Sequence, residues 1–142
     1  MSDAAAAERI ARAGHEGQVD KTGRPYIEHV ERVAAAVAPG LRSIAWLHDV
    51  VEDTPMTAED LAAEGFGPDV VDAVVAITRL DEEEADAYYA RVRANPLALA
   101  VKVSDLADNS APERLALVDA DTRAHLVAKY DHARRELGLT PA

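Results

Sequence analysis

Two pairs of ionisable residues lie four positions apart within the otherwise apolar stretch of residues 44–55. They are His48-Asp49 and Glu52-Asp53. Burying such groups among aliphatic side chains is unfavourable unless another group pairs with them or a metal binds them. At about 100° per residue, a helix would place all four on one polar arc with aliphatic residues opposite. The pattern predicts one helix with a packing face and a face of metal-ligand and acid-base groups. The alternative is a polar stripe on a surface helix, or a His-Asp hydrogen bond at a turn.

Two other predicted helices also carry polar residues within apolar runs. His29 interrupts the interior of the helix predicted over residues 25–38. Lys102, Asp105 and Asn109 lie at positions i, i+3 and i+7 of a later apolar run, on one helical face. Taken alone, His29 would be a hydrogen-bonded core residue, and Lys102 with Asp105 an ordinary intrahelical ion pair.

Taken together, the three segments predict a metal site. The candidate ligands are His29, His48, Asp49 and Asp105. Two imidazoles and two carboxylates suit Mn²⁺, Fe²⁺ or Zn²⁺ better than Ca²⁺, which prefers a shell of oxygen ligands. A metal bound there would lower the pKa of a coordinated water and polarise a phosphoryl group. Glu52 and Asp53 would then flank that water as acid-base or orienting carboxylates.

Composition and periodicity predict an all-α fold. The 142 residues are 49% hydrophobic and 4% aromatic, which suits one domain, residues 1–142, with its own core. Apolar residues recur at helical spacing, and no stretch alternates like a strand. We expect a bundle of about six to eight helices, with the acidic residues 81–84 forming the first turn of one of them. The predicted helices cover residues 3–13, 25–38, 41–53, 57–63, 69–78, 81–94, 97–109 and 121–137.

The formal net charge of −11 limits the choice of partners. It argues against a nucleic-acid surface, because phosphate binding relies on clustered Lys and Arg. A phosphorylated small molecule would have to be attracted by a bound cation and by local basic groups. The candidates are Lys21, Arg24, Lys102 and Arg114.

The sequence also indicates a cellular compartment. It contains no cysteine, so it has no disulfide or thiolate metal site, which fits a cytoplasmic protein. No apolar run approaches the roughly 20 residues of a membrane helix. The first residues lack the pattern of a signal peptide. We therefore expect a cytoplasmic location without membrane association.

The sequence resembles a known family, the HD-domain metal-dependent phosphohydrolases. It is most similar to their alarmone-hydrolase branch, the hydrolase domain of the RelA/SpoT proteins and the small alarmone hydrolases. The most specific part is the HDxxED block at residues 48–53, with a histidine upstream and an aspartate downstream. The matching segments are residues 15–18, 21–29, 47–54, 66–67, 77–80 and 102–105, together with Asn109.

This resemblance implies an HD-type helical bundle that uses Mn²⁺ to remove the 3′-pyrophosphate from (p)ppGpp, giving GDP or GTP and pyrophosphate. It implies metal ligands at the four residues named above. It also implies that Glu52 and Asp53 activate or position water, that Lys21 lines the nucleotide pocket, and that Asn109 lies near the nucleotide sugar. Lys102 is a further candidate for substrate binding.

Four positions depart from the family pattern. Asp20 stands where the family usually has an arginine that packs against the guanine base, and Val30 replaces a proline. Leu106 and Asp108 replace an arginine and a histidine. The metal ligands are therefore retained, while the substrate pocket has lost cations. Two alternatives stay open: a phosphatase for another nucleotide or phosphorylated cofactor, and a non-catalytic nucleotide-binding or interaction module with a structural metal. A homo-oligomer is compatible with each.

The three remaining histidines are interpreted as structural. His15, in the break after the first predicted helix, is expected to bond a nearby backbone group. His125 and His132 lie on the last predicted helix without spaced carboxylates, and we expect both at the surface.

Overall fold

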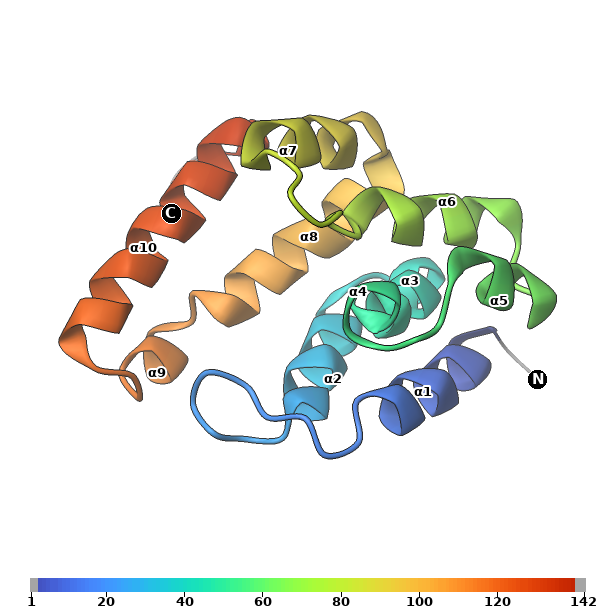
Figure 1. Ribbon diagram of the computed structural model, residues 1–142, viewed down its shortest axis with the longest axis horizontal. Helices are drawn as coiled ribbons and strands as arrows, with labels where there is room; N and C mark the ends of the chain where they lie inside the picture. Colours follow the sequence, from blue (N-terminus) through green and yellow to red (C-terminus); the bar gives the residue numbers. More distant parts are fainter. Residues whose placement is uncertain (1–2, 140–142) are drawn as a thin grey trace.

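The computed structural model describes residues 3–139, and Figure 1 shows their helices. The elements in order are α1 (Asp3–Gly14), α2 (Tyr26–Ala36), the 3-10 helix η1 (Pro39–Leu41), α3 (Arg42–Leu47), α4 (Val50–Asp53), α5 (Ala58–Ala63), α6 (Pro68–Ile77), α7 (Ala85–Ala94), α8 (Pro96–Asn109), α9 (Pro112–Leu115) and α10 (Ala120–Glu136). Residues 3–139 thus contain ten α-helices, two of them only four residues long, where about six to eight were predicted. Over residues 3–139 the only β pairing is an isolated bridge, so the all-α prediction is confirmed.

Helix α8 crosses the middle of the bundle and makes its main contacts with α2, α3, α6 and α7. In Figure 1 it runs diagonally between α7 and α2, and α6 lies next to α3. Val101, at the centre of α8, is fully buried, as are Val30 on α2, Leu47 on α3 and Val74 on α6. The polar residues of α2, α3 and α8 therefore face one another inside a framework of tightly packed aliphatic side chains.

The helix predicted over residues 41–53 is wrong in one respect, because it breaks at His48-Asp49. Helix α3 ends at Leu47, and α4 begins at Val50. The His48 amide bonds the Ala45 carbonyl at 3.4 Å in a 3-10 pattern, and Asp49 leaves the helical region at φ −113° and ψ 1°. A tightened turn followed by a residue in this bridge region ends the regular helix. His48 and Asp49, two of the candidate metal ligands, consequently lie at a helix junction.

The acidic residues 81–84 precede α7, so their prediction as a helical first turn is also wrong. Glu82 has a positive φ of 63°, a conformation that a helix does not contain. The Glu83 carboxylate accepts a hydrogen bond from the Leu80 amide at 3.1 Å and pairs with Arg91 on α7. These contacts form a turn that precedes α7, and the Glu83 carboxylate holds this turn against Arg91 of the helix.

Three further features bear on the sequence predictions. Helix α9 was not predicted, because four residues are too few to show a helical period. The predicted domain limits, residues 1 and 142, lie outside the described residues. Among the described helices, none combines the length and the apolar character that a membrane span requires.

Candidate metal centre

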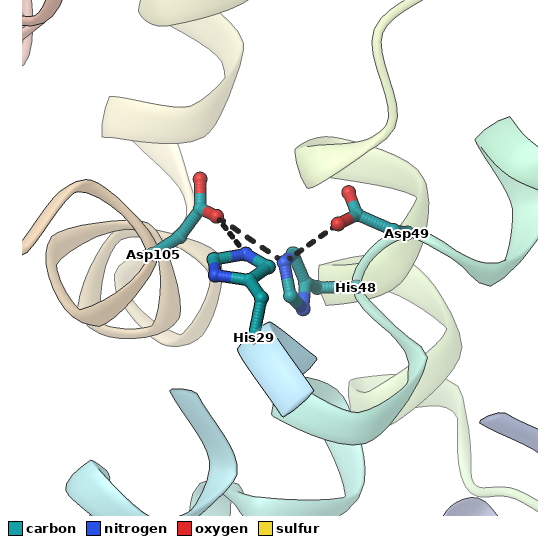
Figure 2. Close-up of side chains that lie close together, drawn as sticks. All are labelled: His29, His48, Asp49 and Asp105. Carbon is teal, nitrogen blue, oxygen red and sulfur yellow. Dashed lines mark hydrogen bonds and ion pairs between the residues drawn. The ribbon is translucent and has the colours of Figure 1, made fainter. Parts of the chain in front are cut away.

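The four predicted metal ligands converge on one point inside the bundle (Figure 2). His29 comes from α2, His48 and Asp49 from the junction of α3 and α4, and Asp105 from α8. One nitrogen or oxygen of each side chain lies within 4.8 Å of those of the others. His29 and His48 are 1% and 2% exposed, so water cannot easily satisfy their ring nitrogens.

Both imidazoles turn the same nitrogen toward this point. His48 Nδ1 lies 2.6 Å from the Ala45 carbonyl, and His29 Nδ1 lies 2.6 Å from the Asp108 carboxylate. A carbonyl and a carboxylate only accept, so each Nδ1 carries a hydrogen and donates it. The Nε2 atoms therefore face inward, toward carboxylate oxygens.

The Nε2 atoms sit where a cation fits. His29 Nε2 is 3.0 Å from Asp105 Oδ1, and His48 Nε2 is 3.0 Å from Asp49 Oδ2 and 3.4 Å from Asp105 Oδ1. His48 Nε2 is buried and makes no hydrogen bond that meets geometric criteria. A nitrogen lone pair facing carboxylates is repulsive unless a proton or metal ion lies between them. Two nitrogens and two carboxylates form a suitable donor set for a divalent transition metal.

Electrostatics at this point favour positive charge. Burial opposes a charge on His48, yet Asp49 and Asp105 raise the pKa of its imidazole well above the ordinary value. Burial would likewise raise the pKa of Asp49, but the charge of His48 lowers it to about 2. Burial also works against Asp105, and Lys102 nevertheless holds the pKa of that carboxyl well below its usual range. Protons and a metal ion would therefore compete for the same place.

Two side chains hold the ligand carboxylates from outside. Lys102 Nζ lies 2.9 Å from Asp105 Oδ2, while Asp105 Oδ1 faces the histidines. The Tyr26 hydroxyl donates to Asp49 Oδ2. Partners of this kind fix the orientation of metal ligands. Lys102, predicted as a substrate-binding residue, thus bonds a ligand carboxylate.

Glu52 and Asp53 both lie on α4, beside the ligand set. Glu52 Oε1 accepts a hydrogen bond from the Arg79 amide at 3.0 Å, and burial raises the pKa of its carboxyl. Burial, followed by the charges of Asp49 and Glu52, raises the pKa of Asp53 to about 6. Each carboxyl is therefore easier to protonate than an ordinary one, as an acid-base role requires.

A small cavity of about 150 Å³ adjoins the ligands. His48, Asp49 and Glu52 line one part of it, and Asp53 is not among its lining residues. The rest of its lining is Ile77, Arg79, Tyr88, Tyr89, Lys102 and Lys129. Three cations beside a group of carboxylates give the cavity a place for an anion as well as a metal.

Arg79 and Lys129 were not predicted as site residues. Arg79 belongs to a segment that matches the family pattern, which is a signal that could have identified it. Lys129 is an exposed lysine on α10 with no distinguishing spacing, and only the packing of α10 near α7 brings it to the cavity.

The predicted substrate residues Lys21 and Asn109 lie next to each other, outside the cavity lining. Lys21 Nζ donates to the Asn109 carbonyl at 2.7 Å and to the Tyr130 hydroxyl at 3.0 Å. Burial and the nearby Arg114 charge lower the pKa of Lys21 to about 8. The Asn109 side-chain amide donates to Asp105 Oδ1 at 3.1 Å.

The remaining histidines have structural surroundings. His15 is 1% exposed and its Nδ1 lies 2.8 Å from the Gln18 side-chain oxygen, so its predicted backbone partner is wrong. His125 and His132 are both exposed or nearly so, as predicted. His132 pairs with Asp86 at 3.2 Å.

The helical bundle and the His-Asp cluster together define the class of protein. The chain belongs to the HD domain family, whose model matches residues 6–136. Its relatives include a guanosine-3′,5′-bis(diphosphate) 3′-pyrophosphohydrolase of Haemophilus influenzae, 44% identical over 78 residues, which are 51% of this chain and 11% of the relative. A GTP pyrophosphokinase of Myxococcus xanthus is 30% identical over 132 residues, which are 86% of this chain and 16% of the relative. The chain thus spans less than a fifth of either relative.

A solved structure shares the fold over nearly the whole chain. It is described as a metazoan ortholog of SpoT that hydrolyzes ppGpp and plays a role in starvation responses. The two structures have a TM-score of 0.75 at 24% identity, covering 96% of this chain and 86% of the other. The predicted HD-type bundle is thereby confirmed.

Proposed function

We propose that this chain is a Mn²⁺-dependent hydrolase that removes the 3′-pyrophosphate from (p)ppGpp. The main support is the geometry of the candidate metal centre. The Nε2 atoms of two histidines and two carboxylates converge beside a cavity that is lined by Glu52 and by three positively charged side chains. Several relatives are named guanosine-3′,5′-bis(diphosphate) 3′-pyrophosphohydrolases, which supports the choice of substrate.

The ligands His29, His48, Asp49 and Asp105 would hold the metal, with Fe²⁺ or Zn²⁺ as alternatives to Mn²⁺. When bound, a divalent ion of this kind lowers the pKa of water and polarises a phosphoryl oxygen. Four protein ligands would leave positions open in a six-coordinate shell. His29 and Asp105 within helices, and His48 and Asp49 at the packed junction of α3 and α4, would be kept in place without a substrate.

The reaction needs a proton acceptor, a proton donor and groups that hold an anion. The oxygen of water would bond to the phosphorus attached to the 3′ oxygen, while water loses a proton. The bond between that phosphorus and the 3′ oxygen would break, and the 3′ oxygen would take up a proton. Glu52, whose Oε1 accepts a hydrogen bond from the Arg79 amide, would accept the proton of the attacking water. Asp53, with its raised pKa, is the second carboxyl available for proton transfer. Arg79, Lys102 and Lys129 would hold the pyrophosphate part.

We infer that the nucleoside part of the substrate binds next to Lys21 and Asn109. We also propose that the protein acts in the cytoplasm. The partner is a small phosphorylated molecule rather than a nucleic acid, because the chain carries a net charge of −11. The single HD domain over residues 1–142 belongs to the same proposal.

One observation favours a second candidate, a phosphohydrolase acting on another nucleotide. The Asp20 carboxylate, at the position where the family usually has an arginine, is 3% exposed and bonded to Arg114. It provides no cation on which a guanine base could stack. The chemistry at the metal would be the same for either substrate.

The test is product analysis of purified protein with ppGpp and Mn²⁺, alongside other nucleotides. The parent should release GDP and pyrophosphate, and Asp49→Ala should release neither. Release of phosphate or pyrophosphate from another nucleotide alone would support the second candidate. Absence of any metal-dependent turnover would overturn both and favour a binding module.

A further inference from the structure

The loop between α1 and α2 is organised by one carboxylate. Asp20 Oδ1 accepts hydrogen bonds from the Thr22 amide at 2.8 Å, the Thr22 hydroxyl at 2.7 Å and the Arg24 amide at 3.1 Å. Gly23 closes the turn with a φ of 84°, a conformation that suits glycine. The loop that carries Lys21 therefore has a defined shape built around Asp20.

The other Asp20 oxygen ties this loop to α9. Arg114 Nη2 donates to Asp20 Oδ2 at 2.9 Å, although the two residues are far apart in sequence. Figure 1 shows the loop, in blue, reaching toward α9. The side chains are 3% and 11% exposed, so this ion pair is shielded from water. Removing one partner of such a pair leaves an uncompensated charge.

The second arm of the Arg114 guanidinium reaches the residues behind the metal ligands. Nη1 donates to Asp108 Oδ2 at 2.9 Å and to Asn109 Oδ1 at 3.2 Å. Asp108 Oδ2 in turn accepts from the metal-ligand His29, and the Asn109 amide donates to the metal-ligand Asp105. Arg114 is thus linked through Asp108 to His29 and through Asn109 to Asp105, two candidate ligands on different helices, and its Nη1 also lies 3.4 Å from His29 Nδ1.

The charges of this network balance without the metal ligands. Asp20 and Asp108 are negative, while Arg114 and the partly exposed Arg32 are positive, with Arg32 Nε 2.7 Å from Asp108 Oδ1. The planar guanidinium presents two separate donor nitrogens in fixed directions, Nη2 toward Asp20 and Nη1 toward Asp108. Asp20 and Asp108, two of the departures from the family pattern, therefore share one arginine.

We propose that Arg114 is a positioning residue for the metal centre, and that Asp20 acts on metal affinity through it. Arg114 orients His29 through Asp108 and Asp105 through Asn109, and Asp20 holds the guanidinium in place. The loop that carries Lys21 is thereby connected to the metal site through the hydrogen bonds of Arg114. The role of Asp20 is therefore to bind Arg114, and not to contact the base of a substrate. The inference rests on the proposed metal centre but does not depend on which nucleotide is hydrolysed.

Metal affinity, measured without substrate, tests the proposal. EDTA-treated full-length protein is titrated with Mn²⁺ by calorimetry, using the parent, Arg114→Met, Arg114→Lys and Asp20→Asn. Loss of partners behind metal ligands typically weakens binding about 10- to 100-fold. Arg114→Met should fall in that range, and Asp20→Asn should weaken binding several-fold. Arg114→Lys should be intermediate, because one ammonium cannot reach both carboxylates.

Two controls separate this effect from a general loss of structure. Glu28→Gln removes the exposed Arg24–Glu28 ion pair beside the same loop and should bind Mn²⁺ like the parent. NMR of the ring nitrogens of His29, with Zn²⁺ in place of paramagnetic Mn²⁺, should show Nδ1 protonated in the parent and a changed Nδ1–H signal in Asp20→Asn. Asn keeps the shape of Asp20, so this variant decides the question if Arg114→Met does not fold.

The outcomes are distinguishable from failure of the proposed reaction. Parent-like Mn²⁺ affinity in a folded Arg114→Met, or in Asp20→Asn with an unchanged His29 signal, would overturn the positioning role. A parent that binds no Mn²⁺ would overturn the metal centre and this inference with it. Mn²⁺ binding that depends on Arg114, without hydrolysis of ppGpp, would uphold the inference and reject the proposed substrate.

Discussion

The metal centre and the loop of residues 19–25 are both rich in charged side chains, but they differ in how those groups are satisfied. In the loop, each Asp20 oxygen has a donor within the protein. At the centre, His48 Nε2 is buried without a hydrogen-bond partner and faces two carboxylates. Buried polar atoms are almost always paired. His15 Nε2 is also buried without a partner, but among the described residues His15 belongs to no group of side chains that could hold a metal. The unpaired His48 Nε2, facing two carboxylates, therefore marks the candidate ligand position, and the paired cluster around Asp20 marks a supporting structure.

The largest effect should come from removing a ligand of the centre. His48→Ala deletes the unpaired nitrogen, so we expect no measurable Mn²⁺ binding and no turnover. The parent should gain about 2.7 kcal/mol of stability when Mn²⁺ is present at about a hundred times its Kd. Thermal melts with and without Mn²⁺ should show this gain in the parent and none in His48→Ala.

The matched control replaces a histidine outside the centre. His125 is exposed on α10, so His125→Ala should retain the full Mn²⁺-dependent rise in melting temperature. A similar loss in both variants would show that the comparison between the two regions is mistaken.

The next effect separates binding of the metal from chemistry. Glu52→Gln keeps the size of the side chain but removes the proton acceptor, so we expect near-parental Mn²⁺ affinity and a turnover reduced about 10²- to 10⁴-fold. Calorimetry and product assays measure the two quantities separately. Glu59→Gln, an exposed change on α5, should leave both unchanged. Parental turnover in Glu52→Gln would remove the assignment of Glu52 as the base.

A smaller effect concerns pH. Neighbouring carboxylates, acting against burial, raise the pKa values of His29 and His48. Their protonated forms stabilise the metal-free fold below the unfolded pKa of about 6.5, and this stability is lost as pH rises through the folded values. Mn²⁺ needs the neutral Nε2 atoms, so its affinity should increase over the same range.

Thermal melts between about pH 6 and pH 8 test this linkage. The difference in melting temperature between Mn²⁺-loaded and EDTA-treated protein should widen as pH rises. A pH-independent difference would mean that protons do not compete with the metal at these histidines.

The smallest effect concerns Asp53, whose pKa is raised to about 6. A raised carboxyl pKa means that ionisation destabilises the fold as pH increases above the ordinary value of about 4, and that the full penalty is present above about pH 6. Asp53→Asn should therefore stabilise EDTA-treated protein by about 1 kcal/mol at pH 7, discounted for solvent screening, and by almost nothing at pH 4.

Urea denaturation at the two pH values measures the difference. The exposed Asp72→Asn on α6 is the control and should give no pH-dependent gain. An equal shift at both pH values in Asp53→Asn would assign the effect to side-chain size or helix capping rather than to ionisation.

Local features of the fold could be predicted because their signals are local. The Thr57–Asp60 capping box forms at the start of α5, with both reciprocal hydrogen bonds present. Pro96 opens α8 and Gly138 has a positive φ just after α10. The convergence of His29, His48, Asp49 and Asp105 was also predictable, since each of these polar groups interrupts an apolar helical run.

The helix break at His48-Asp49 could not be read from periodicity. Apolar spacing continues through it, and the break coincides with contacts to other helices, from Asp49 to Tyr26 on α2 and from His48 to Asp105 on α8. The role of Asp20 is a second case. Its sequence position suggested a lost cation facing a substrate, whereas the structure pairs it with Arg114 on a helix that was not predicted.

The sequence alone thus determined most of the longer helices, their buried faces and the candidate ligands, because these follow from residue type and from spacing along one chain segment. Only the tertiary structure decided which nitrogen of each histidine faces inward, which cations reach the cavity, and which charges neutralise one another. Those properties depend on distances between residues such as Asp20 and Arg114, or Lys129 and Glu52, that lie far apart along the chain. Helix packing sets these distances, and no local pattern encodes them.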